Sequence, residues 1–271
     1  MEFNQLNRKL DNNYSKHKGK MNCLIKRISL IFIGNLLISF PLMAQNIKDV
    51  PRSRTLITSG WDYYTQVPAP ENMNPYAGPT LHERNSLHYT VYENLFYSSM
   101  VGGTVEPWLA ESYEYNSNFT QVTVKLRKDV VWSDGERFDA SDVVFTANML
   151  LANAPEMTYS SQFKGAVKGV EAKDAFTVVF SLIKPNSRWA RDQLAYNLGQ
   201  AARFVIVPEH IWKGQNAKEF NNFDLGKGWP VGTGPYKLVH AGSNQLIFDL
   251  RNSWWASSAS KQRRLCYSKM L

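Results

Sequence analysis

The stretch from Pro107 to Pro155 constrains the fold of this chain more than any other, because every local signal in it agrees. Apolar residues occupy every second position from 122 to 126, which is the period of a strand with one buried face. A short apolar run, Val130–Trp132, follows, and Asp134-Gly135 then breaks the chain as a turn with a left-handed residue does. The sequence therefore predicts a strand followed by a tight turn.

The helix predicted after this turn has a defined start, buried face and end. Asp139 can cap its N-terminus, and Asp142 at the third helical position lies near the positive end of the helix dipole. Pro155 ends it. Its buried face is marked by Val143, Ala147, Leu150 and Leu151. From the residue pattern alone, we expect a domain of the α/β class.

Further segments extend the α/β pattern on both sides of this stretch. Residues 54–59 are typical of a first strand, and residues 81–95 of a helix. Residues 177–182 predict another strand, which Lys184–Ser187 ends, and Ser187 can cap a helix through Ala195. From residue 54 to residue 195, the predicted strands thus alternate with predicted helices.

The last third of the chain predicts a strand, a helix and a hairpin. Phe204–Val207 is typical of a buried strand, and Pro208 can open a helix at its first turn. Arms at Tyr236–His240 and Gln245–Arg251 flank a turn at Ala241–Asn244.

Gly232-Thr233-Gly234 lies just before this hairpin and has two interpretations. The glycines can let the backbone come close to a neighbouring segment. A dinucleotide-binding loop is the competing hypothesis, but Pro235 and a strand follow where that loop requires a helix. The sequence therefore predicts a close backbone contact at this loop.

Four motifs occur in an order that resembles one protein family. They are Asn74-Pro75, the run LAESYEYN with KLRKDVVWSDGERFDASDVVFTANML, Val207–Trp212, and Pro230–Lys237. Together they span the chain from Arg54 to Trp255 and resemble the family 5 extracellular solute-binding proteins. These are the dipeptide, oligopeptide, nickel and oligosaccharide receptors of bacterial ABC importers.

The resemblance implies an α/β fold of the type II periplasmic-binding-protein kind. We expect a first lobe with a mixed twisted sheet, built from residues 45–95 and 200–255, and a small α/β subdomain inserted at residues 96–199. Strands at Arg54 and Phe204 should share one sheet with the hairpin. Family members resembling the chain are longer, so the resemblance implies that the second lobe is missing. The tail 256–271 has neither periodicity nor acidic residues, which suggests a reading-frame break or a gene truncation.

The net charge of +8 comes from the two ends of the chain. Residues 1–44 hold seven Lys and Arg against two Asp and Glu, and residues 251–271 hold five against none. The middle, residues 45–250, has a net charge of −2. Nucleic-acid binding needs a basic face on the folded domain, so we expect no nucleic-acid partner.

Metal and cofactor binding are not predicted. The two cysteines, Cys23 and Cys266, have no His at metal-binding spacing. His82 and His88 are six residues apart, whereas metalloprotease histidines are four apart. The acidic run from Asp134 to Asp142 lacks the ligand spacing of a calcium loop and is better explained as a turn and a helix cap.

The resemblance places the ligand cleft at the loop after the first strand. Aromatic rings there can stack on sugars or cover a peptide, although the alternative is that they pack the loop onto the domain. The candidate ligand-binding residues are Gly60, Trp61, Tyr63, Tyr64, Trp229 and Thr233.

Two classes of function remain. The first is an extracytoplasmic receptor, expected to be monomeric, which closes on a peptide or an oligosaccharide and hands it to the permease subunits of an ABC importer. Aromatic residues near the expected cleft lean slightly toward sugars. The alternative is a secreted hydrolase or other enzyme whose catalytic half is missing, and the sequence shows no nucleophile elbow or phosphate-binding loop. With one lobe alone, we expect weak ligand binding.

The N-terminal region generates a first prediction. Met21 is an alternative start to Met1, and a basic segment after it precedes an uncharged run from Ile28 to Ala44. The alternative of a membrane anchor is less favoured, because this run is short for a membrane span. Residues 1–44 are thus expected to be an upstream extension and a signal peptide, cleaved near Ala44 on export to the periplasm. N-terminal sequencing of the exported protein checks this; an intact N-terminus on a membrane-bound product contradicts it.

Overall fold

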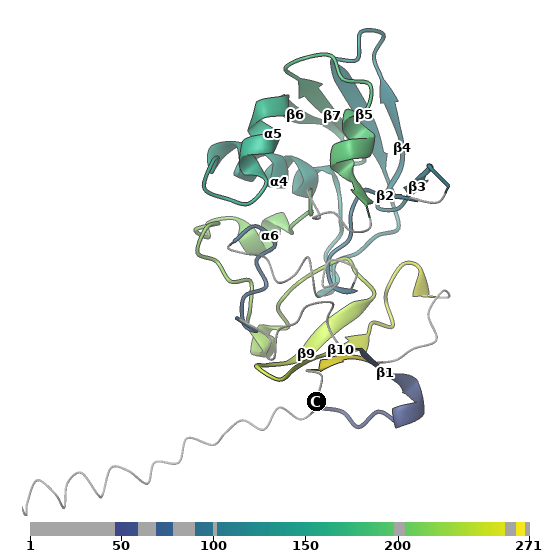
Figure 1. The fold of residues 1–271 in the computed structure, drawn as a ribbon, viewed down its shortest axis with the longest axis vertical. Helices are drawn as coiled ribbons and strands as arrows, with labels where there is room; N and C mark the ends of the chain where they lie inside the picture. The colour runs from purple at the N-terminus through teal and green to yellow at the C-terminus, as the bar shows by residue number, and fades with distance from the viewer. Residues whose placement is uncertain are drawn as a thin grey trace, which may run out of the picture. The chain divides into compact units, whose positions relative to one another are not determined.

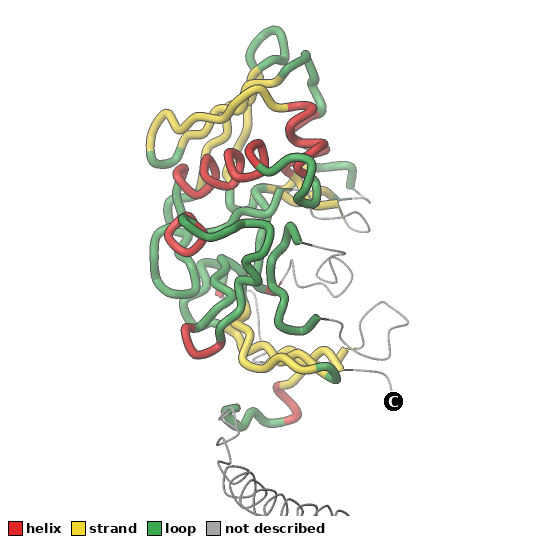
Figure 2. The backbone as a smooth tube through the Cα atoms, turned by 90° about the vertical axis from the view of Figure 1, so that its left-hand side faces the viewer, coloured by secondary structure: helices red, strands yellow, loops and turns green. Residues whose placement is uncertain are grey.

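The computed structural model describes residues 47–58, 69–77, 90–99, 102–197, 204–257 and 264–268. These residues belong to one compact unit, Ile47–Leu271, and form three small sheets with short helices (Figure 1). Between the two four-stranded sheets, much of the described chain consists of loops (Figure 2). None of the helices in these ranges is long and apolar enough to cross a membrane.

One four-stranded sheet combines the two ends of the unit. Its strands are β1 (Thr55–Thr58), β11 (Arg264–Ser268), β10 (Gln245–Leu250) and β9 (Tyr236–Gly242), in that spatial order. β1 runs parallel to β11, whereas β11 and β9 both run antiparallel to β10, so the sheet is mixed. A 3₁₀ turn, η1 (Arg52–Arg54), precedes β1.

The second four-stranded sheet is antiparallel and carries helices on one face. Its order is β4 (Ala110–Tyr115), β5 (Gln121–Leu126), β7 (Thr177–Leu182) and β6 (Val167–Asp174). Helices α4 (Ala140–Ala152) and α5 (Ser160–Ala166) pack against β6 and β7 (Figure 1). The inward side chains of the central strands are fully buried, namely Val122, Val124, Val178 and Phe180.

A three-stranded sheet and several short helices complete the described structure. β2 (Phe96–Ser98) lies between β3 (Val105–Pro107) and β8 (Ala195–Asn197). The remaining elements are the π-helical turn η2 (Ala190–Leu194), α6 (Glu209–Trp212) and the 3₁₀ turn η3 (Leu225–Lys227).

The strongest local predictions are confirmed. β5 occupies the alternating segment, and Gly135 in the following turn has a positive φ of 97°. Asp139 caps α4 in a reciprocal capping box, because its side chain accepts from the first turn while Asp142 accepts from the Asp139 N–H at 3.2 Å. The hairpin also forms, with β9 and β10 joined at Ser243-Asn244.

The predicted strand at Phe204–Val207 is wrong, although the segment is extended and buried. Side chains rather than a neighbouring strand bind its backbone. Asn94 donates to the Phe204 carbonyl at 3.2 Å, and the Tyr76 hydroxyl donates to the Val205 carbonyl. The Thr146 hydroxyl accepts from the Val207 N–H at 3.1 Å. Because buried backbone groups need partners of any kind, a side-chain cradle serves as well as a sheet.

Other predictions differ in extent. In the predicted 81–95 helix, Thr90 is helical and Val91–Leu95 form a turn and loop, while residues 81–89 lie outside the described residues. The helix expected from Ser187 is only the turn η2, and Trp189 is its N-terminal boundary. The tail, for which no element is predicted, contains β11 between β1 and β10.

The side-chain cradle of Phe204–Val207 can be tested with Thr146→Val. Val has nearly the same shape, so the loss isolates the hydroxyl of a fully buried Thr whose partners are the Val207 N–H and C=O. We expect the free energy of unfolding to fall by about 1–3 kcal/mol, because these groups lose their partner. Urea unfolding measures this. Thr123→Val on the outward side of β5 is the matched control and should change it by under about 0.5 kcal/mol. Equal effects of both substitutions would contradict the cradle.

Candidate functional site

The loop Gly232–Gly234 is pressed against the backbone of Thr90-Val91. A Cβ atom on Gly232 would lie 2.0 Å from the Val91 carbonyl oxygen, and one on Gly234 would lie 2.4 Å from that of Thr90. The Gly234 N–H donates to the Val91 carbonyl at 2.9 Å. The close backbone contact predicted for the two glycines is therefore confirmed, and no other residue fits here.

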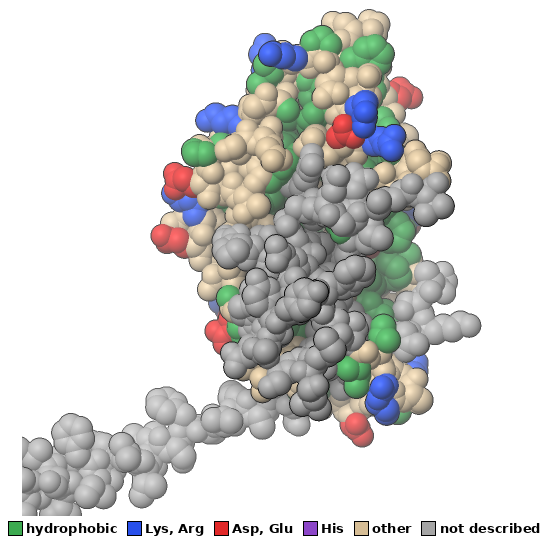
Figure 3. All heavy atoms as spheres, viewed as in Figure 1, with side chains coloured by type: hydrophobic (Ala, Val, Ile, Leu, Met, Phe, Trp, Pro, Cys, Tyr) green, Lys and Arg blue, Asp and Glu red, His purple; other side chains and the backbone are tan. Residues whose placement is uncertain are grey.

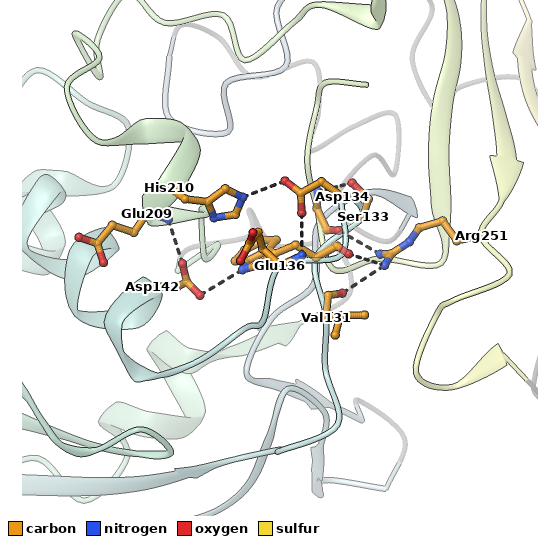
Figure 4. A network of polar contacts seen from close by, with 10 residues as sticks. Val131, Ser133, Asp134, Glu136, Asp142, Glu209, His210 and Arg251 are labelled. Atoms are coloured by element: carbon orange, nitrogen blue, oxygen red, sulfur yellow. Dashed lines mark hydrogen bonds and ion pairs between the residues drawn. The ribbon is translucent and has the colours of Figure 1, made fainter. Parts of the chain in front are cut away.

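Arg251 joins this loop to the segment before the Asp134 turn (Figure 4). Its Nη1 donates to the carbonyls of Gly232 at 3.0 Å and Gly234 at 2.8 Å. Its Nη2 donates to the carbonyls of Val131 at 3.1 Å and Trp132 at 3.0 Å. Burial lowers the pKa of Arg251, and the charges of Glu93 and Asp134 partly offset this. The guanidinium thus holds two backbone segments together through hydrogen bonds to four carbonyl groups.

Glu93 is the acidic counterpart of this anchor and is 2% exposed. Its Oε1 accepts from the indole nitrogens of Trp108 at 2.8 Å and Trp254 at 3.2 Å, and its Oε2 accepts from that of Trp255 at 3.2 Å. Burial raises the pKa of Glu93 to about 7, although hydrogen bonds from these indoles and from the Thr233 side chain oppose the rise. The Glu93 carboxylate therefore connects its own segment to three others, which contain Trp108, Thr233 and Trp254-Trp255.

A second acidic group ties the ends of two helices together (Figure 4). Asp142 accepts from the Glu209 N–H at 2.9 Å, at the start of α6, and from the Trp132 indole at 3.1 Å. Burial raises the pKa of Asp142 to about 6 against the effect of these bonds. Nearby, Asp134 Oδ2 lies 2.8 Å from His210 Nε2, which links α6 to the turn.

The predicted ligand-binding residues fall into two groups. Gly60, Trp61, Tyr63 and Tyr64 lie outside the described residues. Thr233 is 2% exposed and its side chain bonds Glu93, whereas Trp229 is half-buried. The Trp229 ring meets Phe220 edge to face at 5.4 Å, with Lys227 at 4.8 Å. Their role as ligand contacts stays a prediction.

Sequence reasoning missed Glu93, Arg251 and the three tryptophans that bind Glu93. Glu93 falls within the predicted helix 81–95, where an acidic residue is ordinarily expected on the solvent side. One available signal was an acid enclosed by the large apolar residues of Val91–Phe96. Another was the pair Trp254-Trp255 shortly after a strand.

On the described part of the face shown in Figure 3, basic and acidic side chains are interspersed. Within the described ranges, no group of three or more His, Cys, Asp or Glu side chains is placed to hold a metal ion.

Solved structures with a similar fold define the class of protein. A periplasmic oligopeptide-binding protein of Thermotoga maritima, crystallised with mannohexaose, matches with a TM-score of 0.66 and 27% identity over 82% of this chain and 39% of that chain. NikZ of Campylobacter jejuni, crystallised with Ni(L-His), matches with a TM-score of 0.62 and 22% identity over 82% of this chain and 40% of its own. The fold is α/β and of the type II periplasmic-binding-protein kind, as expected.

The sequence profile of the bacterial extracellular solute-binding proteins, family 5, middle region, matches residues 104–269. The chain therefore belongs to this family, which confirms the resemblance. The match continues past Trp255, where the recognised motifs ended, and includes β11.

Curated relatives carry peptide-binding names. The dipeptide-binding protein of Escherichia coli is 27% identical over 250 residues, which cover 85% of this chain and 44% of that protein. The probable peptide-binding protein YejA of Agrobacterium fabrum is 29% identical over 159 residues, covering 56% of this chain and 24% of the relative. The chain thus spans less than half the length of these relatives.

Gly232→Ala tests the close contact in the buried network. The new methyl group would overlap the Val91 carbonyl, so we expect the free energy of unfolding to fall by about 3 kcal/mol or more. Gly165→Ala in α5 is the matched control, because nothing lies within 4 Å of its added Cβ and a helix favours Ala. Chemical denaturation measures both. A Gly232→Ala protein as stable as the Gly165→Ala protein would refute the contact.

Proposed function

We propose that this chain is the solute-binding component of a bacterial ABC importer and that its solute is a peptide. The observation that carries the proposal is membership of family 5 together with relatives that are named as peptide-binding proteins. In this proposal the protein closes around its ligand by a hinge motion and passes it to the permease subunits. The residues expected to contact it are the six candidates named in the sequence analysis.

A non-catalytic role is part of the proposal. The buried charged groups of the described structure are engaged in the fold itself: Glu93 by indoles, Arg251 by carbonyls and Asp142 by backbone and indole N–H groups. A catalytic acid or base must reach a substrate. The alternative of a secreted enzyme finds no support among relatives named for binding.

Peptide is favoured over oligosaccharide on two grounds. The relatives cited above carry peptide names, although a neighbour in structure was crystallised with mannohexaose. In addition, the Trp229 ring is engaged with Phe220 and Lys227, which leaves less of it for stacking on a sugar.

The proposal extends to location and architecture. Export by the N-terminal segment and action in the periplasm are proposed, since E. coli and Haemophilus influenzae relatives include proteins named as periplasmic. A monomeric state is also part of the proposal. We also propose that residues 45–95 and 200–255 form the main part of a lobe, with residues 96–199 inserted. Support comes from β1, β9 and β10 sharing one sheet and β4–β7 forming another.

The proposed function predicts how tightly the 271-residue chain binds its ligand. Micromolar binding corresponds to about 8 kcal/mol, and half of that leaves a dissociation constant near millimolar. Because the chain covers 44% of the E. coli relative, we expect it to bind peptides in that weak range and to bind tighter when a relative's remaining length is fused to it. Tryptophan fluorescence during titration with peptide and oligosaccharide pools measures both proteins.

The outcomes separate the alternatives. Saturation of the fused protein by peptides alone supports the proposal, whereas saturation by oligosaccharides alone contradicts the peptide assignment. Micromolar binding by the 271-residue chain alone would contradict the expected weak affinity and show that its residues suffice for the site. If neither protein binds either pool, or if the ligand is chemically altered on incubation, the proposed function is wrong.

A further inference from the structure

The three indoles around Glu93 are not equivalent. Trp108 and Trp254 share Oε1, whereas Trp255 alone among them is bonded to Oε2. Trp254 is 7% exposed, whereas Trp108 and Trp255 are both half-buried. Among the three indoles, Trp255 is therefore the half-buried one that does not share its carboxylate oxygen with another indole.

Trp255 belongs to the connection between two neighbouring strands of one sheet. β10 ends at Leu250 and β11 begins at Arg264, and between them Trp254–Ser257 forms a turn closed by a 3.0 Å bond from the Ser257 N–H to the Trp254 carbonyl. The same carboxylate binds Thr233, in the glycine loop. Glu93 thus holds the start of this connection against the rest of the unit.

We propose that Glu93 is a positioning residue that fixes the Trp254–Ser257 turn through Trp255, and that uptake of a proton on Oε2 releases Trp255. The neutral carboxyl keeps Oε1 as an acceptor for Trp108 and Trp254. Its Oε2 becomes an O–H group, which accepts more weakly than a carboxylate oxygen, so the bond from the Trp255 indole weakens and this N–H exchanges to water. The inference does not depend on the proposed function.

The surroundings of Glu93 bear on when the proton binds. Burial raises the pKa of Glu93 to about 7, from an ordinary 4.5. Arg251 is the buried cation near it. The Arg127 guanidinium carbon lies 4.5 Å from the centre of the Trp255 ring, and Arg127 pairs with Asp129 at 2.9 Å. The other titratable groups facing this region from the packed elements are Tyr97, Glu111 and Asp134.

The sign of the linkage separates holding from stability. Because folding raises the pKa of Glu93, the folded chain binds the proton more tightly, and this group's contribution to stability falls as pH rises from 4.5 to about 7. The ionised carboxylate that holds Trp255 is therefore the form that burial disfavours. At neutral pH the ionised Glu93 therefore holds the turn, although its ionisation lowers the free energy of unfolding.

Indole N–H signals in the NMR spectrum of the full chain, labelled with ¹⁵N-tryptophan, test the inference. Each of the eight tryptophans gives one signal, and Trp255→Phe identifies that of Trp255. We expect the Trp255 signal to move with pH in one step with a midpoint at about 7. The Trp132 signal should follow Asp142 instead, with a midpoint at about 6.

Three variants identify the titrating group. Glu93→Gln should abolish the Trp255 step. Glu106→Gln removes an exposed carboxylate on β3 and should leave the step unchanged. His210→Gln should also leave it unchanged, because His210 contacts Asp134 and has no bond to Glu93.

The result that overturns the inference is equally defined. A wild-type Trp255 signal without a step between roughly pH 5 and pH 9 sinks it, as does a step that persists in Glu93→Gln or disappears in His210→Gln. Unmoved signals of the buried Trp189 and Trp212 show that a variant is folded. If Glu93→Gln fails to fold, Glu93→Asp decides: it keeps a titrating carboxyl one methylene shorter, and an unshifted midpoint would contradict the role of Glu93.

Discussion

The described structure depends on one buried guanidinium. Arg251 binds carbonyls of the Val131-Trp132 segment, about 120 residues earlier in the chain, and those of the glycine loop. These donors all go to backbone, so the contact fixes the course of two segments that have no strand pairing with each other. A lysine could not reproduce it, because its ammonium group lacks the planar fork of donors. Direct bonds also hold the glycine loop, since the Ser133 N–H donates to the Gly232 carbonyl and the Gly234 N–H donates to the Val91 carbonyl, both at 2.9 Å.

A buried cation needs an anionic counterpart, and Glu93 supplies it at a distance. The two charges act on each other, but their hydrogen bonds go elsewhere: Arg251 to carbonyls and Glu93 to indoles and a hydroxyl. Each ion is thus solvated by the protein's own dipoles rather than by direct pairing. Burying unpaired ions is costly, and several charge-assisted bonds to each are what offset that cost. The arrangement specifies where four segments meet more than it adds stability.

The sequence predicts best where the determinants are local. The turn at Gly135 and the capping of α4 by Asp139 require residues only a few positions apart, so periodicity and capping rules suffice. Phe204–Val207 looks like a strand because it is apolar, but its bonds come from side chains as far as 129 residues away. β11 has five residues and exists because β1 and β10 lie on either side of it. The role of Glu93 could not be predicted for the same reason, because its indole and hydroxyl partners lie at least 15 residues away along the chain.

The buried network also bears on what this part of the molecule contributes to function. A group that performs acid–base chemistry must exchange its proton with a substrate, whereas the oxygens of Glu93 face donors that belong to the fold. Groups used in this way set the shape of a frame. A receptor gains from such a frame, because every loop that is ordered before the ligand arrives removes an entropy cost from binding. The chemistry of this region therefore fits the family's role of holding a solute, and the exception is the Glu93–Trp255 contact, where the frame itself can respond to a proton.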